Sequence, residues 1–192
     1  MALDTYANLQ AAVATWAWRT GDTDFTAAVP DMITMVEEVL NYGGEGIEPL
    51  RVRDMEMDDT ITVTSGVGDL PPDYLQYRTL QYGTPARDLP SSEWSIVGDT
   101  IKTTRTDVSP LALGYYAKIP ALSDANTTNW LLVRSPKVYL FGALIHAEAF
   151  MREDPRMATW GQLFTSALSG LRTSDGMSKF ARATSRPKGP TP

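Results

Sequence analysis

The segment from Pro136 to Met151, PKVYLFGALIHAEAFM, constrains the fold of this chain more than any other. Its apolar residues fit a helix but occupy almost the whole circumference, which is typical of a helix at the centre of a bundle or an interface. The pattern is too short, and too interrupted by His146 and Glu148, to cross a membrane. We therefore expect a helix covered by other parts of the chain. Its large apolar residues are Val138, Leu140, Phe141, Leu144, Ile145 and Phe150.

A second helical pattern follows directly, from Pro155 to Leu171. Both patterns begin with a capping side chain ahead of a proline, at Ser135-Pro136 and at Asp154-Pro155, which predicts a helix start at each place. The apolar residues of the second helix recur at steps of three and four, so they share one face. These residues are Met157, Trp160, Phe164, Leu168 and Leu171.

The N-terminal region predicts two amphipathic helices. Asp4 or Thr5 caps the first, Gly21 ends it, and Tyr6, Leu9, Val13 and Trp16 form its apolar face. The second enters through Thr23, Asp24 and Pro30, stops at Tyr42-Gly43-Gly44, and buries Val29, Ile33, Val36 and Leu40. Each helix needs a partner surface, and the apolar helix from Pro136 supplies one. We expect a helical bundle built from both ends of the chain.

The middle of the chain changes period. After Pro49 the pattern approaches two, β-branched residues increase, and Gly98-Asp99 is a hairpin signal between Val97 and Thr100. This predicts a small antiparallel β domain of about five or six strands. The fold class is therefore α+β, with N-terminal helices in 1–48, an inserted β domain in 49–119, C-terminal helices in 120–171 and an extended basic tail in 172–192. The expected strands lie in 51–57, 60–64, 74–82, 95–97, 100–104 and 111–117.

Charge is distributed unevenly along the chain. The net charge is -6, so an overall basic nucleic-acid footprint is absent. The tail beyond Leu171 nevertheless carries five basic residues and one acid, Asp175, which suggests an arm that docks on another surface. The absence of cysteine excludes disulfides and thiol chemistry. The N-terminus has no secretory pattern, so we expect a soluble protein made in the cytoplasm.

Candidates for chemistry are few. The single histidine, His146, points away from Glu148 on a helix, so we expect a packed rather than a metal-binding side chain. Neighbouring helical residues diverge by about 100°, so Glu37 and Glu38 predict a solvated pair and no catalytic dyad. We predict no catalytic residue, no cofactor site and no metal site. The remaining acidic cluster, which has the oxygen ligands of a cation site but the spacing of no calcium loop, is Asp54, Glu56, Asp58 and Asp59.

Two short features have simple structural interpretations. The GxG spacing at Gly66 and Gly68 lacks a third glycine and a following helix, so it predicts a turn. Trp16 and Trp160 lie on apolar faces and are expected in the core, whereas Trp18 and Trp94 are less obviously buried.

Several segments together resemble the adaptor (head–tail connector) proteins of tailed bacteriophages. They are TYANLQAAVATW, VPDMI, LRVRDM, LPPDYLQYRTLQY, EWSIVGDTI and the stretch 115–171, which includes YYAKIPALSD, TNWLL, SPKVYLFGAL and DPRMATW. The resemblance lies in the order and spacing of these segments. The Tyr42–Pro49 loop and the tail beyond Leu171 depart from it.

The resemblance implies a virion protein at the head–tail junction, with a structural role and no enzymatic activity. It implies a ring of about twelve subunits that joins the portal protein to the tail or nozzle and lets genomic DNA pass without specific binding. In such adaptors the C-terminal extension often reaches the portal. The residues of this chain that would dock there are Arg172, Lys179, Phe180, Arg182, Arg186 and Lys188.

Two alternatives of other classes stay open from the sequence. A virion-associated protein that degrades peptidoglycan needs a general acid and a second carboxylate, for which Glu56, Asp58 and Asp59 are the candidates. A free-standing helical bundle that binds a small ligand in its core is the other.

Overall fold

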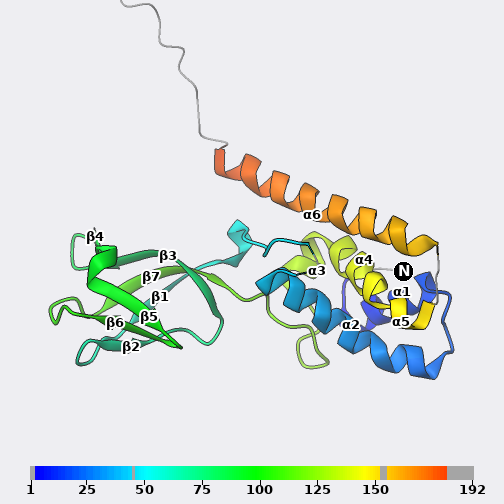
Figure 1. Cartoon of the computed structure of the whole chain (residues 1–192), viewed down its shortest axis with the longest axis horizontal. Helices are drawn as coiled ribbons and strands as arrows, with labels where there is room; N and C mark the ends of the chain where they lie inside the picture. The colour runs from blue at the N-terminus through cyan, green and yellow to red at the C-terminus, as the bar shows by residue number, and fades with distance from the viewer. Residues whose placement is uncertain (1–2, 45, 152–154, 181–192) are drawn as a thin grey trace, which may run out of the picture. The chain divides into compact units, whose positions relative to one another are not determined.

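A computed structural model describes residues 3–44, 46–151 and 155–180 of the chain (Figure 1). Two compact units divide it. The helical unit comprises Met1–Leu40 and Ala121–Pro192, and the β unit comprises Asn41–Pro120. The α+β class is confirmed, with helices in one unit and two antiparallel sheets in the other.

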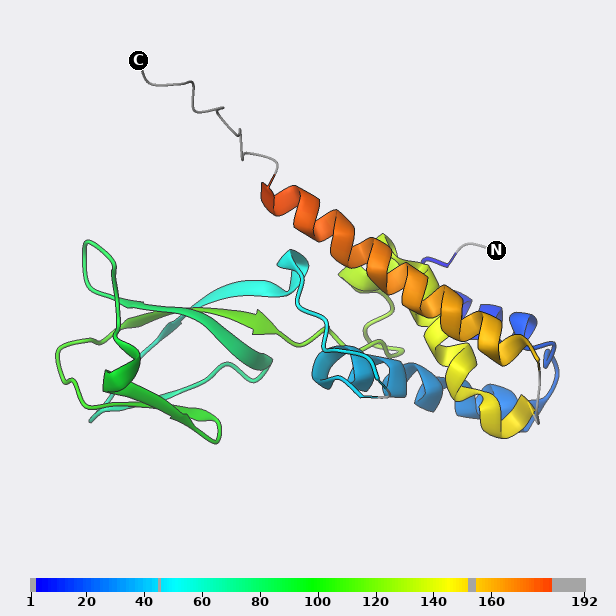
Figure 2. The same cartoon turned by 45° about the horizontal axis from the view of Figure 1, so that its top comes forward.

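The helical unit is organised around α4 (Pro136–His146). In both Figure 1 and Figure 2, α4 lies between α2 (Thr23–Tyr42) and α6 (Arg156–Phe180). Short helices α1 (Tyr6–Trp16), α3 (Trp130–Arg134) and α5 (Glu148–Met151) complete it. The apolar faces expected for α2 and α6 are buried, with Val29, Ile33, Val36 and Leu40 on the first and Trp160, Phe164, Leu168 and Leu171 on the second.

Gly142 shows how closely the three long helices approach one another. A Cβ atom built at this position would lie 2.7 Å from a Val36 methyl carbon of α2 and 3.1 Å from the Phe164 ring of α6. The absence of a side chain at this position therefore lets both α2 and α6 pack closely against α4.

Several helix boundaries differ from the sequence prediction. Thr5 caps α1 as expected, its hydroxyl accepting from Asn8 N at 3.3 Å, but α1 ends at Trp16 and not near Gly21. The apolar pattern from Pro136 is two helices, α4 and α5, which are separated by Ala147. Helix α6 continues past Leu171 to Phe180, so the predicted extended tail from Arg172 is helical over its first part. The buried face of α6 continues one turn past Leu171, at Asp175.

Helix α3 was not predicted. Its signal is Asn129, whose side-chain oxygen accepts from Leu132 N at 2.9 Å and so caps the helix. A run of five residues between two proline-containing segments is too short to show helical periodicity in the sequence.

The β unit contains a four-stranded and a three-stranded antiparallel sheet. The first has the order β1 (Glu56–Ile61), β7 (Leu111–Ala117), β3 (Tyr74–Tyr82), β4 (Arg87–Asp88). The second has the order β2 (Val67–Asp69), β6 (Thr100–Thr103), β5 (Trp94–Val97). The expected hairpin is confirmed, with Val97 opposite Thr100 and Gly98 at a φ of 60°.

The core of the β unit is a single cluster between the two sheets, to which Leu111, Leu113 and Ile101 contribute their fully buried side chains. Two short 3-10 turns, η1 (Arg53–Met55) and η2 (Ser91–Glu93), precede β1 and β5. The two sheets contain seven strands, whereas five or six were expected. Strands β2 and β4 were missed, because β2 covers Gly68, which was predicted in a turn, and the two-residue β4 carries no period-2 signal. The expected strand over 60–64 is not separate, since Thr60 and Ile61 end β1. The expected strand over 51–57 begins only at Glu56, since η1 occupies the residues before it.

Within the described ranges, no helix is both long and apolar enough to span a membrane.

Candidate interaction surfaces

One apolar exposed surface of the helical unit is a groove between the end of α1 and the start of α6, here called the tryptophan groove. It encloses about 450 Å³. Trp18 is 83% exposed and Trp16 is 47% exposed. Exposed aromatic side chains around a concave surface are typical of protein interfaces. The lining residues are Thr15, Trp16, Trp18, Arg156, Thr159, Trp160 and Leu163.

Arg156 connects the two walls of this groove. Its Nη1 donates to the Trp16 carbonyl at 3.3 Å, and its guanidinium lies 5.1 Å from the centre of the Trp160 ring. The groove is thus held in shape and carries one positive charge on an aromatic wall.

Trp16 corrects the sequence prediction, which put this residue in the core. Its ring packs edge-on against Phe141 at 5.8 Å on one side and borders the groove on the other. Because α1 ends at Trp16, no further helical turn covers the outer side. Trp18 follows with a φ of 60°, which a non-glycine residue rarely adopts. Leu163 was missed, since it lies one position off the buried face of α6.

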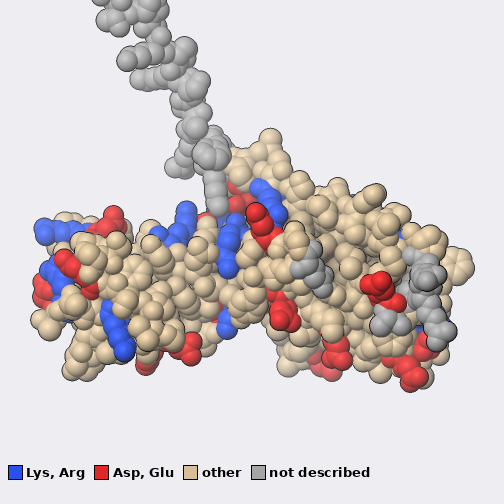
Figure 3. Space-filling view, viewed as in Figure 1, with Lys and Arg blue, Asp and Glu red and all other residues tan. Residues whose placement is uncertain are grey.

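A second exposed surface of the helical unit is acidic. Along α2, Asp24, Asp31 and Glu38 are exposed, and their spacing of seven places them on one face. Figure 3 shows Asp and Glu side chains gathered over α2. Met35, which is 48% exposed, lies between Asp31 and Glu38 on this face. We call these four residues the α2 outer face.

Glu37 contradicts the prediction of a solvated carboxylate pair, because it is only 6% exposed while Glu38 faces solvent. Its Oε1 accepts from the Tyr139 hydroxyl at 3.0 Å and from Leu122 N at 2.9 Å. Asn129 Nδ2 donates to the same Tyr139 hydroxyl at 2.7 Å. The sequence prediction missed Tyr139, whose hydroxyl reaches Glu37 from the helix that was expected to be apolar over almost its whole circumference.

Burial raises the pKa of Glu37, and the hydrogen bonds from Leu122 and Tyr139 oppose this shift in part. Burial, and then the neighbouring Glu37 charge, raises the pKa of the Tyr139 hydroxyl far above its ordinary range. This buried network joins α2, α4 and the segment before α3, so its role is structural.

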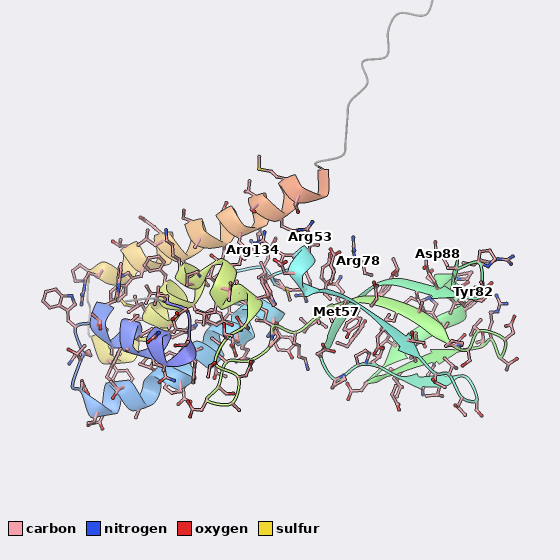
Figure 4. The ribbon with its side chains drawn as sticks, turned by 180° about the vertical axis from the view of Figure 1, so that it is seen from behind. Arg53, Met57, Arg78, Tyr82, Asp88 and Arg134 are labelled. Atoms are coloured by element: carbon pink, nitrogen blue, oxygen red, sulfur yellow. The ribbon has the colours of Figure 1, made fainter. Side chains whose placement is uncertain are left out.

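Part of the acidic cluster of the β unit, Glu56 and Asp58, lies near arginines. Figure 4 shows Arg53, Met57 and Arg78 at one end of the four-stranded sheet and Tyr82 and Asp88 at the other. Glu56 forms an ion pair with Arg78. Glu56 and Asp58 line a depression of about 240 Å³ together with Arg53 and Arg78.

The geometry of this depression gives little support to the wall-degrading alternative. Its volume is below the roughly 300–1,000 Å³ of typical small-molecule sites. Successive strand residues alternate between faces, and Asp59 does not line the depression beside Asp58. No group of acidic or histidine side chains in the part of the chain that the structure describes is arranged to hold a metal ion.

The structure describes only part of the predicted docking tail. Arg172 is exposed on α6. Lys179 and Phe180 close α6, and their side chains are not described. Arg182, Arg186 and Lys188 lie outside the described residues. His146, the other singled-out residue, is partly buried at the end of α4.

Comparison with known proteins gives one assignment. The family model described as SU10 adaptor protein matches residues 4–187, which is nearly the whole chain. No curated protein sequence matches the chain.

Proposed function

The chain belongs to the SU10 adaptor protein family, a family of phage head–tail adaptors, and from this premise we propose that it forms a ring joining the portal to the tail or nozzle. A phage adaptor is a structural virion component that contacts other head and tail proteins. The observation that carries the proposal is the match over residues 4–187, which includes both the helical and the β unit.

The proposed ring contains about twelve copies and stands at the head–tail junction, with genomic DNA passing through its centre. The helices act as a bundle that supplies subunit contacts, and the β unit is inserted into that bundle. The exposed tryptophans, together with the acidic outer side of α2, support this role, because a ring subunit needs at least two different contact surfaces.

The proposed ring lets DNA pass without binding it tightly. The net charge of -6 supports this property, because non-specific affinity for the phosphate backbone comes from clustered cations.

The C-terminal segment is the proposed portal anchor. The candidate contacts are the exposed Arg172, the apolar Phe180 and the basic residues that follow. Acidic portal surfaces would pair with this charge, and Phe180 would insert as an apolar plug. Because α6 continues to Phe180, the proposed anchor begins on a helix.

The experiment measures binding of the full chain to purified portal rings. A chain truncated after Phe180 keeps α6, and a second variant with Gln at Arg182, Arg186 and Lys188 keeps the length. The proposal predicts portal binding by the full chain and weaker binding by both variants. Binding that is unchanged in both would place the anchor elsewhere, and no binding by the full chain would contradict the adaptor role itself.

A further inference from the structure

We propose that the α2 outer face of one copy docks into the tryptophan groove of a second copy, with Met35 as the central contact. This inference rests on the proposed ring and names the surfaces that build it. The two surfaces belong to the same helical unit and differ from each other, so the contact is heterologous.

The groove is suited to a flexible apolar side chain. Its walls are Trp16, Trp18 and Trp160, with Leu163 beside them, and its volume of about 450 Å³ exceeds that of one large side chain. Methionine is unbranched and its sulfur contacts aromatic rings favourably. Met35 is 48% exposed on a helix whose other long apolar side chains Ile33 and Leu40 are buried, so it is available for such a contact.

Charge distinguishes a second copy from other occupants. Asp31 and Glu38 lie four residues before and three residues after Met35, so both flank it on the same helical face. The groove contributes Arg156, which lies against the Trp160 ring. When Met35 enters the groove, the Asp31 and Glu38 carboxylates approach the Arg156 guanidinium. The apolar contact of Met35 is then bordered by side chains of opposite charge.

The exposed side of α6 extends this surface. Beyond Leu163, residues at steps of three and four along the same flank are uncharged, and Met177 closes the row with most of its side chain exposed. Small side chains permit close approach of another helix. The acidic α2 outer face therefore meets no like charge along this row, which consists of Thr159, Leu163, Ser166, Gly170, Thr173 and Met177.

The placement of the two surfaces suits a ring. Helices α2 and α6 lie on opposite sides of α4 in both views (Figures 1 and 2). A contact between one side of a subunit and the opposite side of the next subunit can repeat from copy to copy. If each copy is rotated by the same angle relative to the one before it, the copies close into a ring.

The absence of cysteine permits a direct test with single-cysteine variants and a short bis-maleimide reagent. The Met35→Cys and Leu163→Cys variants are mixed under two conditions. In the first the chains are free in solution at high concentration, and in the second they are bound to portal rings. Thr26→Cys, exposed on α2 about two and a half turns before Met35, replaces Met35→Cys in the control mixture. We expect a cross-linked dimer from Met35→Cys with Leu163→Cys, and none from the control mixture or from either variant alone.

Three results overturn the inference: no dimer in the test mixture, an equal yield in the control mixture, or a dimer of Met35→Cys with itself. If several copies bind each portal but the test mixture yields no dimer, the proposed function stands and this interface is wrong. If the chain ignores the portal, the free-chain mixtures still decide the interface.

A charge variant gives an independent measurement. Asp31→Lys combined with Glu38→Lys places like charges beside Arg156 and should weaken self-association about tenfold. The matched control is Asp69→Lys with Asp99→Lys, which makes the same charge change at exposed positions of the β unit. Equal weakening by both pairs would show that only net charge matters and would overturn the specific contact.

Discussion

The two units of this protein differ in where they place their paired charged side chains. The helical unit keeps a carboxyl group, Glu37, inside its core and satisfies it with Tyr139 and a backbone N–H. The β unit keeps one ion pair at the surface, where Arg105 bonds Asp107 at 2.6 Å, and a partly buried one between Arg78 and Glu56. A buried polar network is costly to break, whereas an exposed ion pair contributes little because solvent screens it. The units should therefore differ in how they respond to substitution and to pH.

The largest expected effect tests whether each unit has a core of its own. Leu113 is buried in the β unit and Leu132 in the helical unit. Leu113→Ala should lower the free energy of unfolding of the β unit by about 2–5 kcal/mol, because it leaves a cavity. Native-state hydrogen exchange should show lost protection only in the β unit, and Leu132→Ala should show the reverse. Equal loss in both units for either variant would mean that they share one cooperative core.

Gly142 tests the close packing of α4 against α2 and α6. Gly142→Ala forces its Cβ towards Val36 and should lower the free energy of unfolding by about 1–3 kcal/mol. Gly170→Ala is the matched control, since nothing lies within 4 Å of its built Cβ. That control should stabilise the helix by about 0.5–1 kcal/mol. Urea titration measures both, and a stabilising Gly142→Ala would refute the packing described.

Tyr139→Phe removes the hydroxyl that Glu37 and Asn129 share. With one buried partner gone, the free energy of unfolding should fall by about 1–3 kcal/mol. Tyr116→Phe in the β unit gives the comparison, since no residue in the described part of the chain is seen to hydrogen-bond its hydroxyl. Its effect should be near zero in the same urea titration. A neutral Tyr139→Phe would show that the network contributes nothing net.

The pH dependence of the helical unit follows from Glu37. Because burial raises its pKa, the protonated carboxyl is favoured in the folded state. Its contribution to stability is therefore present below the unfolded pKa and is lost as pH rises through the folded one. Glu37→Gln abolishes this titration, so wild type should gain stability relative to the variant as pH falls from about 8 to about 5. A pH-independent difference between the two unfolding free energies would contradict the raised pKa.

The smallest effect is expected at Asp107. Its hydrogen bonds with Arg105 hold the pKa of the Asp107 carboxyl below its ordinary value, but the pair lies at the surface. Asp107→Asn should leave the unfolding midpoint unchanged within error in high salt, since salt screens exposed charges. A clear loss at high salt would remove the contrast between the two units.

Sequence patterns identified the helices where a long apolar face is repeated. The buried faces of α2 and α6 follow directly from steps of three and four, and the Gly98-Asp99 hairpin follows from its turn residues. The end of α1 and the break at Ala147 depend on packing, which periodicity does not report. Strand β4 is too short to carry a period.

The surfaces were harder to predict than the fold. Trp16 has the position of a core residue on its helix, and only the end of α1 leaves it exposed. Glu37 adjoins Glu38 in sequence, so its burial depends on a tyrosine about a hundred residues away in the chain. Contacts of this kind between distant segments are invisible to local spacing.

The measurement that tests the account most directly is the solution mass of the purified chain, alone and after mixing with portal rings. The proposed ring predicts a complex in which each portal carries about twelve copies of the chain, whatever the mass of the free chain. A chain that keeps the same mass with and without portal rings would contradict the adaptor account.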